Sequence, residues 1–125
     1  MKKILSTAPG RVCLFGDHQD YLELPVIACA IDRIMKIHAQ ENGKDQFEIN
    51  MPDVDQKRKI SLKPDFNEIS RGDFFKTALK VLHKIQIVPN KGYSLTITSK
   101  IPINAGLSSS SALTIAWIQF LIAAF

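Results

Sequence analysis

The sequence predicts an α+β fold, in which a layer of strands packs against a layer of helices. Two observations support this prediction. Stretches with strand patterns fill the first half of the chain and return near residue 93, whereas residues 73–85 and 111–125 carry helical patterns. The chain has 125 residues, of which 46% are hydrophobic and 22% charged, so it has the composition of a globular protein and is expected to form one domain.

The first strands are expected near the N-terminus. Residues 3–7 should form a short strand, and residues 8–21 a polar loop, because Pro9 and Gly10 interrupt regular structure. Residues 25–31 form an apolar run, which predicts a buried strand.

A hairpin is expected next. Residues 34–38 and 47–51 both alternate apolar and polar side chains, and Asn42 and Gly43 between them are a turn signal. The two stretches are therefore predicted to pair with each other. Residues 59–62 follow as a further short strand.

The second half of the chain contains the predicted helices. Asp73 is a suitable N-cap for a helix over residues 73–85, whose apolar positions recur every 3.6 residues. These apolar residues are Phe74, Phe75, Ala78, Leu79, Leu82 and Ile85. Residues 93–101 alternate as a half-exposed strand. Residues 111–125 are almost wholly apolar, which predicts a core helix that needs cover on every side, and we expect the chain to be the front part of a longer protein.

Charge and cysteine content narrow the class of protein. The net charge is +4, but the basic residues are scattered, and their one tight cluster, residues 57–59, is expected at a solvated edge or turn. This balance suits a small anionic ligand better than a nucleic acid. Cys13 and Cys29 lack metal or redox spacing, so we expect buried thiols in a cytoplasmic protein. The apolar run at the end is shorter than the roughly 20 residues that span a membrane.

A run of serines opens the last helix. Residues 102–112 read P-I-N-A-G-L-S-S-S-S-A, between a predicted strand and a predicted helix. Backbone N–H groups at a helix start favour anions such as phosphate, and serine hydroxyls can ligate Mg²⁺. One serine is enough to cap a helix, however, so capping alone is an open alternative on the local pattern. No Walker motif is present, since no lysine follows Gly106.

A second polar cluster lies near the N-terminus. Residues 8–21 read A-P-G-R-V-C-L-F-G-D-H-Q-D-Y, and they place Arg11, Asp17, His18 and Asp20 among apolar residues. A guanidinium can stabilise a transferring phosphoryl group, and carboxylates and imidazole can bind the hydroxyls of a polyol. The alternative is a solvated loop in which Asp and Arg pair with each other.

These two stretches resemble motifs of the GHMP kinases, the superfamily of galactokinase, homoserine kinase, mevalonate kinase and phosphomevalonate kinase. Residues 102–112 are similar to its central P-x-G-x-G-L-S-S-S-A motif. Residues 8–21 resemble its first motif, in particular the galactokinase-like P-G-R-V-N-L-I-G-E-H-x-D-Y. The resemblance implies the N-terminal domain of the two-domain GHMP kinase fold, which is similar to ribosomal protein S5 domain 2. It covers only the front part of the usual length, so residues 1–125 would be an incomplete N-terminal domain without the C-terminal domain.

The resemblance also implies roles for individual residues. One group would bind the phosphates of ATP, with Ser110 on the side of Mg²⁺. This group comprises Asn104, Ala105, Gly106, Leu107, Ser108, Ser109 and Ser110. Arg11 is similar to the arginine near the transferring phosphoryl group. Asp17, His18, Asp20 and Tyr21 match positions that bind a sugar in galactokinase-like members.

The implied activity is ATP- and Mg²⁺-dependent phosphorylation of a small sugar. The residues His18 to Tyr21 favour a sugar over mevalonate, although Asn104 replaces a glycine, Asp17 replaces a glutamate, and the glycine pair expected after Tyr21 is missing. The alternatives are an isoprenoid alcohol kinase similar to mevalonate kinase and a non-catalytic sensor of sugar and nucleotide. Because the family's catalytic aspartate lies downstream of the serine motif, residues 1–125 alone are expected to be nearly inactive.

Overall fold

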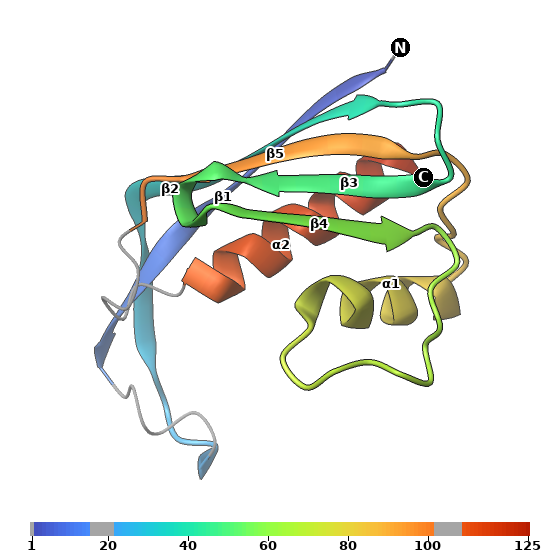
Figure 1. Ribbon diagram of the computed structural model, residues 1–125. Helices are drawn as coiled ribbons and strands as arrows, with labels where there is room; N and C mark the ends of the chain where they lie inside the picture. The colour runs from blue at the N-terminus through green and yellow to red at the C-terminus, as the bar shows by residue number, and fades with distance from the viewer. Residues whose placement is uncertain (1, 16–21, 102–108) are drawn as a thin grey trace.

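A five-stranded sheet with both helices packed on one face makes up the fold (Figure 1). The computed structural model describes residues 2–15, 22–101 and 109–125. The strands and helices are β1 (Lys3–Phe15), β2 (Ile27–Glu41), β3 (Gln46–Met51), β4 (Gln56–Ser61), α1 (Phe74–Lys84), β5 (Tyr93–Ser99) and α2 (Ser109–Ala124), with the short 3-10 turn η2 (Pro52–Val54) after β3. The predicted α+β class is confirmed.

The order of strands in the sheet is β1-β2-β5-β3-β4. All neighbouring pairs are antiparallel except β3 and β5, which run parallel. Alternate side chains such as Ile37, Leu95 and Phe47 point to the helices and are buried, while His38 and Thr96 lie exposed on the opposite face. This alternation is what a sheet covered on one face requires.

Strand β1 is longer than the sequence indicated. The predicted strand over residues 3–7 continues to Phe15, so the prediction of a loop from residue 8 onward is wrong up to that residue. The pairing of β1 with β2 shifts register between Pro9 and Arg11. Proline is tolerated there because β1 is an edge strand and a bulge needs no ladder donor at that position. The rest of the predicted loop lies outside the described residues.

The predicted hairpin between residues 34–38 and 47–51 is also wrong. Both stretches are strands, but β5 lies between them in the sheet. The connection after β2 crosses the start of β5, where the Asn42 amide donates to the Gly92 carbonyl at 3.1 Å. A Cβ at Gly92 would overlap the carbonyl oxygen of Lys44, so only glycine fits beneath this crossing.

Helix α1 confirms the sequence reading closely. It spans Phe74–Lys84, and the Asp73 side chain accepts a hydrogen bond from the Lys76 amide as the N-cap. Asp73 also forms a bidentate ion pair with Arg58 of β4. The basic residues 57–59 thus lie on an edge strand, as expected, but Arg58 is turned inward and joins β4 to α1.

Helix α2 packs lengthwise on the sheet. It starts at Ser109, two residues before the predicted start, and buries Ala112, Ala116, Trp117, Phe120 and Leu121. The Phe47 ring of β3 contacts the Trp117 ring edge-on at a centroid distance of 5.3 Å. The sheet and α1 therefore supply much of the cover that the sequence left unexplained. No helix within the described ranges is long and apolar enough to cross a membrane.

A two-stranded ribbon extends beyond the sheet. Residues 27–31 of β2 pair with β1 alone among the described strands, and Figure 1 shows this ribbon leading away from both helices. The strand predicted over residues 25–31 is confirmed from Ile27 onward, but the prediction that it is buried is wrong, since Ile27 is 56% exposed. The thiols were also expected to be buried, but Cys29 is exposed and Cys13 is half-buried.

Candidate functional site

Part of the sequence-predicted site lies on described elements. Arg11 is on β1, and Ser109 and Ser110 form the first turn of α2. The predicted sugar-binding residues Asp17, His18, Asp20 and Tyr21 and the predicted phosphate-binding residues Asn104, Ala105, Gly106, Leu107 and Ser108 lie outside the described residues. What the structure does describe is the surroundings of both motifs.

A cavity joins the first motif to the start of α2. It has a volume of about 400 Å³ and lies between the β1 segment 8–11, Ala30 of β2, and Ser111, Ala112 and Ile115 of α2. We call it the β1 cavity. Arg11, more than ninety residues from α2 in the chain, thereby lies beside the same helix turn as the serines. The two motifs that the sequence singled out are close together in space.

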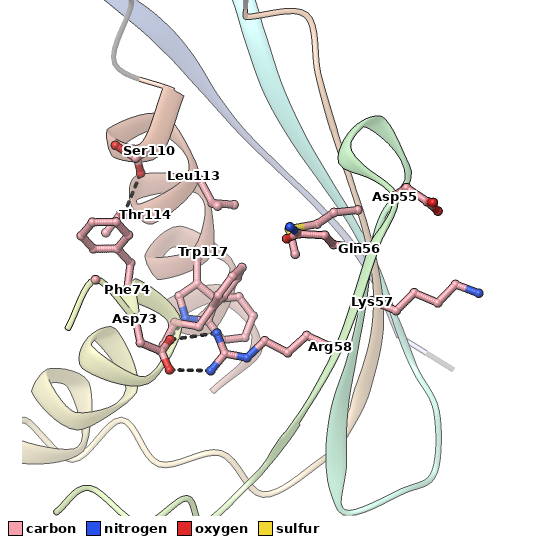
Figure 2. A pocket seen from close by; sticks show the side chains of 13 residues that line it. Asp55, Gln56, Lys57, Arg58, Asp73, Phe74, Ser110, Leu113, Thr114 and Trp117 are labelled. Atoms are coloured by element: carbon pink, nitrogen blue, oxygen red, sulfur yellow. Dashed lines mark hydrogen bonds and ion pairs between the residues drawn. The ribbon is translucent and has the colours of Figure 1, made fainter. Parts of the chain in front are cut away.

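A second cavity lies on the other side of the same turn. It has a volume of about 640 Å³ and is lined by the end of β3, the start of β4, the start of α1 and the first turns of α2 (Figure 2). We call it the α1 cavity. Ser110 and Thr114 line it from α2, and Phe74, which is 47% exposed, lines it from α1. Helix α2 thus begins between two cavities.

A network of contacts fixes the wall of the α1 cavity. The Arg58 Nη1 donates to Asp73 Oδ1 at 2.9 Å, and the guanidinium lies 5.6 Å from the centre of the Phe75 ring. The indole Nε1 of Trp117 donates to the Phe75 carbonyl at 3.1 Å. These contacts hold the start of α1 against α2, so that Phe75 is buried and its neighbour Phe74 projects into the cavity.

Charge within this network favours the ionised carboxylate of Asp73. Hydrogen bonds from Arg58 lower the pKa of Asp73 below its ordinary value, and the Lys76 amide acts in the same direction. Burial opposes them, but the net shift is downward. The carboxylate is therefore ionised and paired throughout the neutral range.

The start of α2 has the properties of an anion site. The N–H groups of a first helical turn have no partner within the helix, and the helix dipole places partial positive charge there. Two hydroxyl side chains, Ser110 and Ser111, are exposed at this turn, one toward each cavity. Thr114 Oγ1 donates to the Ser110 carbonyl at 2.9 Å, so that side chain secures the turn.

The side chains available as ligands indicate what kind of metal site the described residues could form. The described residues contain no group of three or more His, Cys, Asp or Glu side chains that could hold an ion. Mg²⁺ commonly keeps several waters and binds through one or two protein oxygens together with substrate phosphates. The exposed hydroxyl of Ser110, at a helix start whose N–H groups favour anions, fits that kind of site.

Sequence reading missed the role of Phe74. It was counted with the apolar face of α1, yet it is exposed at the mouth of the α1 cavity. Two adjacent phenylalanines were only a weak signal, because consecutive residues can both be buried on one helix, as Ala78 and Leu79 are here. Gln56, which lines the same cavity, carried no comparable signal.

Comparison with known proteins gives two family matches. Residues 1–40 match the galactokinase galactose-binding signature, and residues 73–125 match the N-terminal domain of GHMP kinases. Mevalonate kinase of Methanocaldococcus jannaschii is 34% identical over 116 residues, covering 89% of this chain and 37% of that protein. Galactokinase of Thermosipho africanus is 38% identical over 111 residues, covering 87% of this chain and 30% of that protein.

Solved structures show the same fold. The crystal structure of the Methanococcus jannaschii mevalonate kinase superposes with a TM-score of 0.80 at 28% identity, covering 98% of this chain and 40% of that one. Lactococcus lactis galactokinase complexed with galactose gives a TM-score of 0.76 at 23% identity, covering 90% of this chain and 30% of that one. The chain spans less than half of the length of the relatives that it matches.

Proposed function

Because the chain belongs to the GHMP kinase family, we propose that it serves a kinase that transfers the γ-phosphoryl group of ATP to a hydroxyl group of a small molecule. The observation that carries this proposal is the position of the α2 start between two cavities, one beside Arg11 and one beside Phe74. A phosphoryl-transfer site needs two substrates that meet at one phosphate, and this arrangement provides a place for each.

The nucleotide is proposed to occupy the α1 cavity. Phe74 offers an exposed aromatic face against which a base can stack, and the cavity volume of about 640 Å³ suits a nucleoside. The phosphates would then extend to the first turn of α2, where N–H groups and the serine hydroxyls bind them. Mg²⁺ bound with the phosphates would neutralise their charge. Ser110 is the residue whose hydroxyl we propose as a ligand of this ion.

The acceptor is proposed to bind on the other side, at the β1 cavity. Arg11 lies there and would stabilise the negative charge of the transferring group. In the reaction, the acceptor oxygen loses its proton to a base and forms a bond to the γ-phosphorus. The bond from that phosphorus to the bridging oxygen breaks, and ADP leaves.

A sugar is our first candidate for the acceptor. The match of residues 1–40 to a galactose-binding signature supports it, as does the pattern from His18 to Tyr21. Mevalonate is the second candidate, because several similar relatives are mevalonate kinases. Either acceptor presents a hydroxyl to the same phosphate.

We also propose that residues 1–125 are the N-terminal domain of a two-domain kinase. The relatives are more than twice as long as the part that this chain matches. The resemblance assigns the catalytic aspartate to a downstream position, so these residues are proposed to bind both substrates with little turnover of their own.

Equilibrium titration tests the proposal and separates the two acceptors. The chain is titrated with the Mg²⁺ complex of a non-hydrolysable ATP analogue, and then, at saturating nucleotide, with D-galactose and with mevalonate. We expect the nucleotide and galactose to bind. Asp20→Asn should abolish galactose binding and leave nucleotide binding unchanged, while the control Asp45→Asn, distant from both cavities, should change neither.

The other outcomes are equally informative. Binding of mevalonate in place of galactose would select the second candidate. Failure of the wild-type chain to bind the nucleotide at millimolar concentration would contradict the proposed function.

A further inference from the structure

Strand β5 continues beyond the strand that supports it on one side. The pairing of β3 with β5 ends at Asn50 and Thr96. The pairing of β2 with β5 continues to Met35 and Ser99. The last residues of β5 therefore lack a ladder partner on the β3 side, and a backbone N–H there needs another acceptor.

Asp53 supplies that acceptor. Its Oδ2 accepts a hydrogen bond from the Ser99 amide at 2.7 Å, although Asp53 is in the turn η2 and 46 residues away in the sequence. The turn itself is well fixed, since Pro52 occupies its first position and Asp55, with φ of 50°, donates its N–H to the Pro52 carbonyl at 3.2 Å. A carboxylate on a short, fixed turn replaces the missing strand.

Ser99 in turn holds the residues that follow it. Its Oγ accepts from the Ile101 amide at 3.0 Å, and the Lys100 amide donates to the Ile34 carbonyl at 3.2 Å. These are the last described residues before residues 102–108, the stretch whose sequence predicts phosphate binding. The end of β5 is thus held in place by contacts with Asp53 and Ile34.

The same residues face the start of α2. Asp53 and Ser99 line a cavity of about 330 Å³ together with Ser109 and Ser110. This cavity adjoins the α1 cavity, because both are lined by Met51, Gln56, Ser110 and Leu113. Asp53 therefore lies on the wall of the same cavity as Ser109 and Ser110, which belong to the proposed phosphate site.

We propose that Asp53 is a positioning residue for phosphate binding, which acts by fixing Ser99 at the end of β5, beside Ser109 and Ser110 at the start of α2. This inference rests on the proposed function, since it assigns Asp53 a part in the same nucleotide site. Asp53 does not itself bind the phosphates. A carboxylate near the phosphates repels them. We therefore attribute the role of Asp53 to its hydrogen bond with the Ser99 amide at the end of β5.

Asp53 has two effects on phosphate affinity: anchoring of Ser99 should raise it, and charge repulsion should lower it. The two effects can therefore be separated. If anchoring dominates, Asp53→Ala weakens nucleotide binding, whereas Asp53→Asn, whose amide oxygen can still accept from Ser99, retains it. If charge repulsion dominates, both variants bind phosphate more tightly. Asp45, at the opposite end of β3, provides the matched control for loss of one carboxylate, as Asp45→Ala and Asp45→Asn.

The experiment is calorimetric titration of these variants and the wild-type chain with Mg²⁺-ATP and with Mg²⁺-tripolyphosphate. We expect Asp53→Ala to lower the affinity for both ligands by about fivefold to tenfold, the equivalent of one hydrogen bond. We expect Asp53→Asn and both control variants to stay within about twofold of the wild type. Equal loss for both ligands would place the effect at the phosphates and not at the nucleoside, which tripolyphosphate lacks.

Three results would count against the inference. Unchanged affinity of Asp53→Ala, or tighter binding by both Asp53 variants, would overturn it while the proposed function stands. A wild-type chain that binds neither ligand would overturn the proposed function and this inference with it.

Discussion

Asp73 illustrates how one residue serves several parts of the fold. Its carboxylate caps α1, pairs with Arg58 of the edge strand β4, and lines the α1 cavity beside Phe74. The sequence predicted the cap because an Asp before a 3.6-residue period is a familiar helix start. It did not predict the ion pair, because nothing local indicates that Arg58 lies against α1.

The stability of the protein should depend on the charge of Asp73. Hydrogen bonding to Arg58 lowers the pKa of Asp73, so its stabilising effect is complete above the ordinary carboxyl pKa of about 4 and is lost as the pH falls through the lower folded value. Asp73→Asn should therefore lower the free energy of unfolding by about 1 to 2 kcal/mol at pH 7. Urea unfolding at several pH values measures this difference, which should shrink below pH 4. A difference that is constant down to pH 2 would contradict the assignment.

The hydroxyl of Tyr93 should affect stability in the opposite direction to the carboxylate of Asp73. Its ring is buried against Phe120, and its hydroxyl has no hydrogen-bond partner among the described residues. Burial raises the pKa of Tyr93, and Glu41 adds to the effect. Because the hydroxyl is desolvated without compensation, Tyr93→Phe should leave the free energy of unfolding unchanged or raise it by up to about 1 kcal/mol. A loss of more than 1 kcal/mol in thermal or urea unfolding would show that the hydroxyl has a partner.

At the scale of elements, the sequence predicted where helices and strands lie better than it predicted which strands pair. The patterns of α1, β5 and α2 gave their positions to within about two residues, because period and capping are local properties. The hairpin failed because strand pairing is not local. Nothing in residues 34–51 indicates that β5, more than forty residues later, inserts between the two strands.

The crossing over β5 makes Gly92 essential to that insertion. Gly92→Ala should lower the free energy of unfolding by about 3 kcal/mol, because a Cβ would overlap backbone oxygens of Lys44 and Gln46. Gly43→Ala, in the connection between β2 and β3 that crosses Gly92, is the matched control. It has open space but a φ of 68°, so it should cost only about 1 kcal/mol. Equal losses for the two variants in urea unfolding would contradict this account of the crossing.

The ribbon of β1 and β2 should be the least stable part of the sheet. Residues 11–15 and 27–31 pair with each other alone among the described strands, and Leu14 and Ile27 are largely exposed. Residues 35–41 of β2, by contrast, pair on both sides. Amide hydrogen exchange should therefore be at least tenfold faster in the ribbon than in residues 35–41. Equal protection in the two regions would mean that the ribbon is covered in solution.

At the scale of the whole molecule, the sequence located the two motifs, and the fold explains how they meet. Strand β1 and helix α2 are at opposite ends of the chain, yet Ser6 Oγ donates to the Ala116 carbonyl at 2.7 Å and binds one to the other. Neither this contact nor the cavities on both sides of α2 could be predicted, because each depends on how the sheet brings distant segments together. The resemblance to a family supplied the expectation that the motifs meet, and the β1 cavity supports it for Arg11.

The most direct test of the central claim is nuclear magnetic resonance of the isotope-labelled chain during titration with Mg²⁺-ATP. The account predicts that amide shifts change around the start of α2 and the α1 cavity, at Ser110, Thr114 and Phe74. It predicts no change at His38 and Thr96, on the face of the sheet away from the helices. Shifts centred on that open face, or no shifts at millimolar nucleotide, would contradict the claim that the start of α2 is the phosphate site.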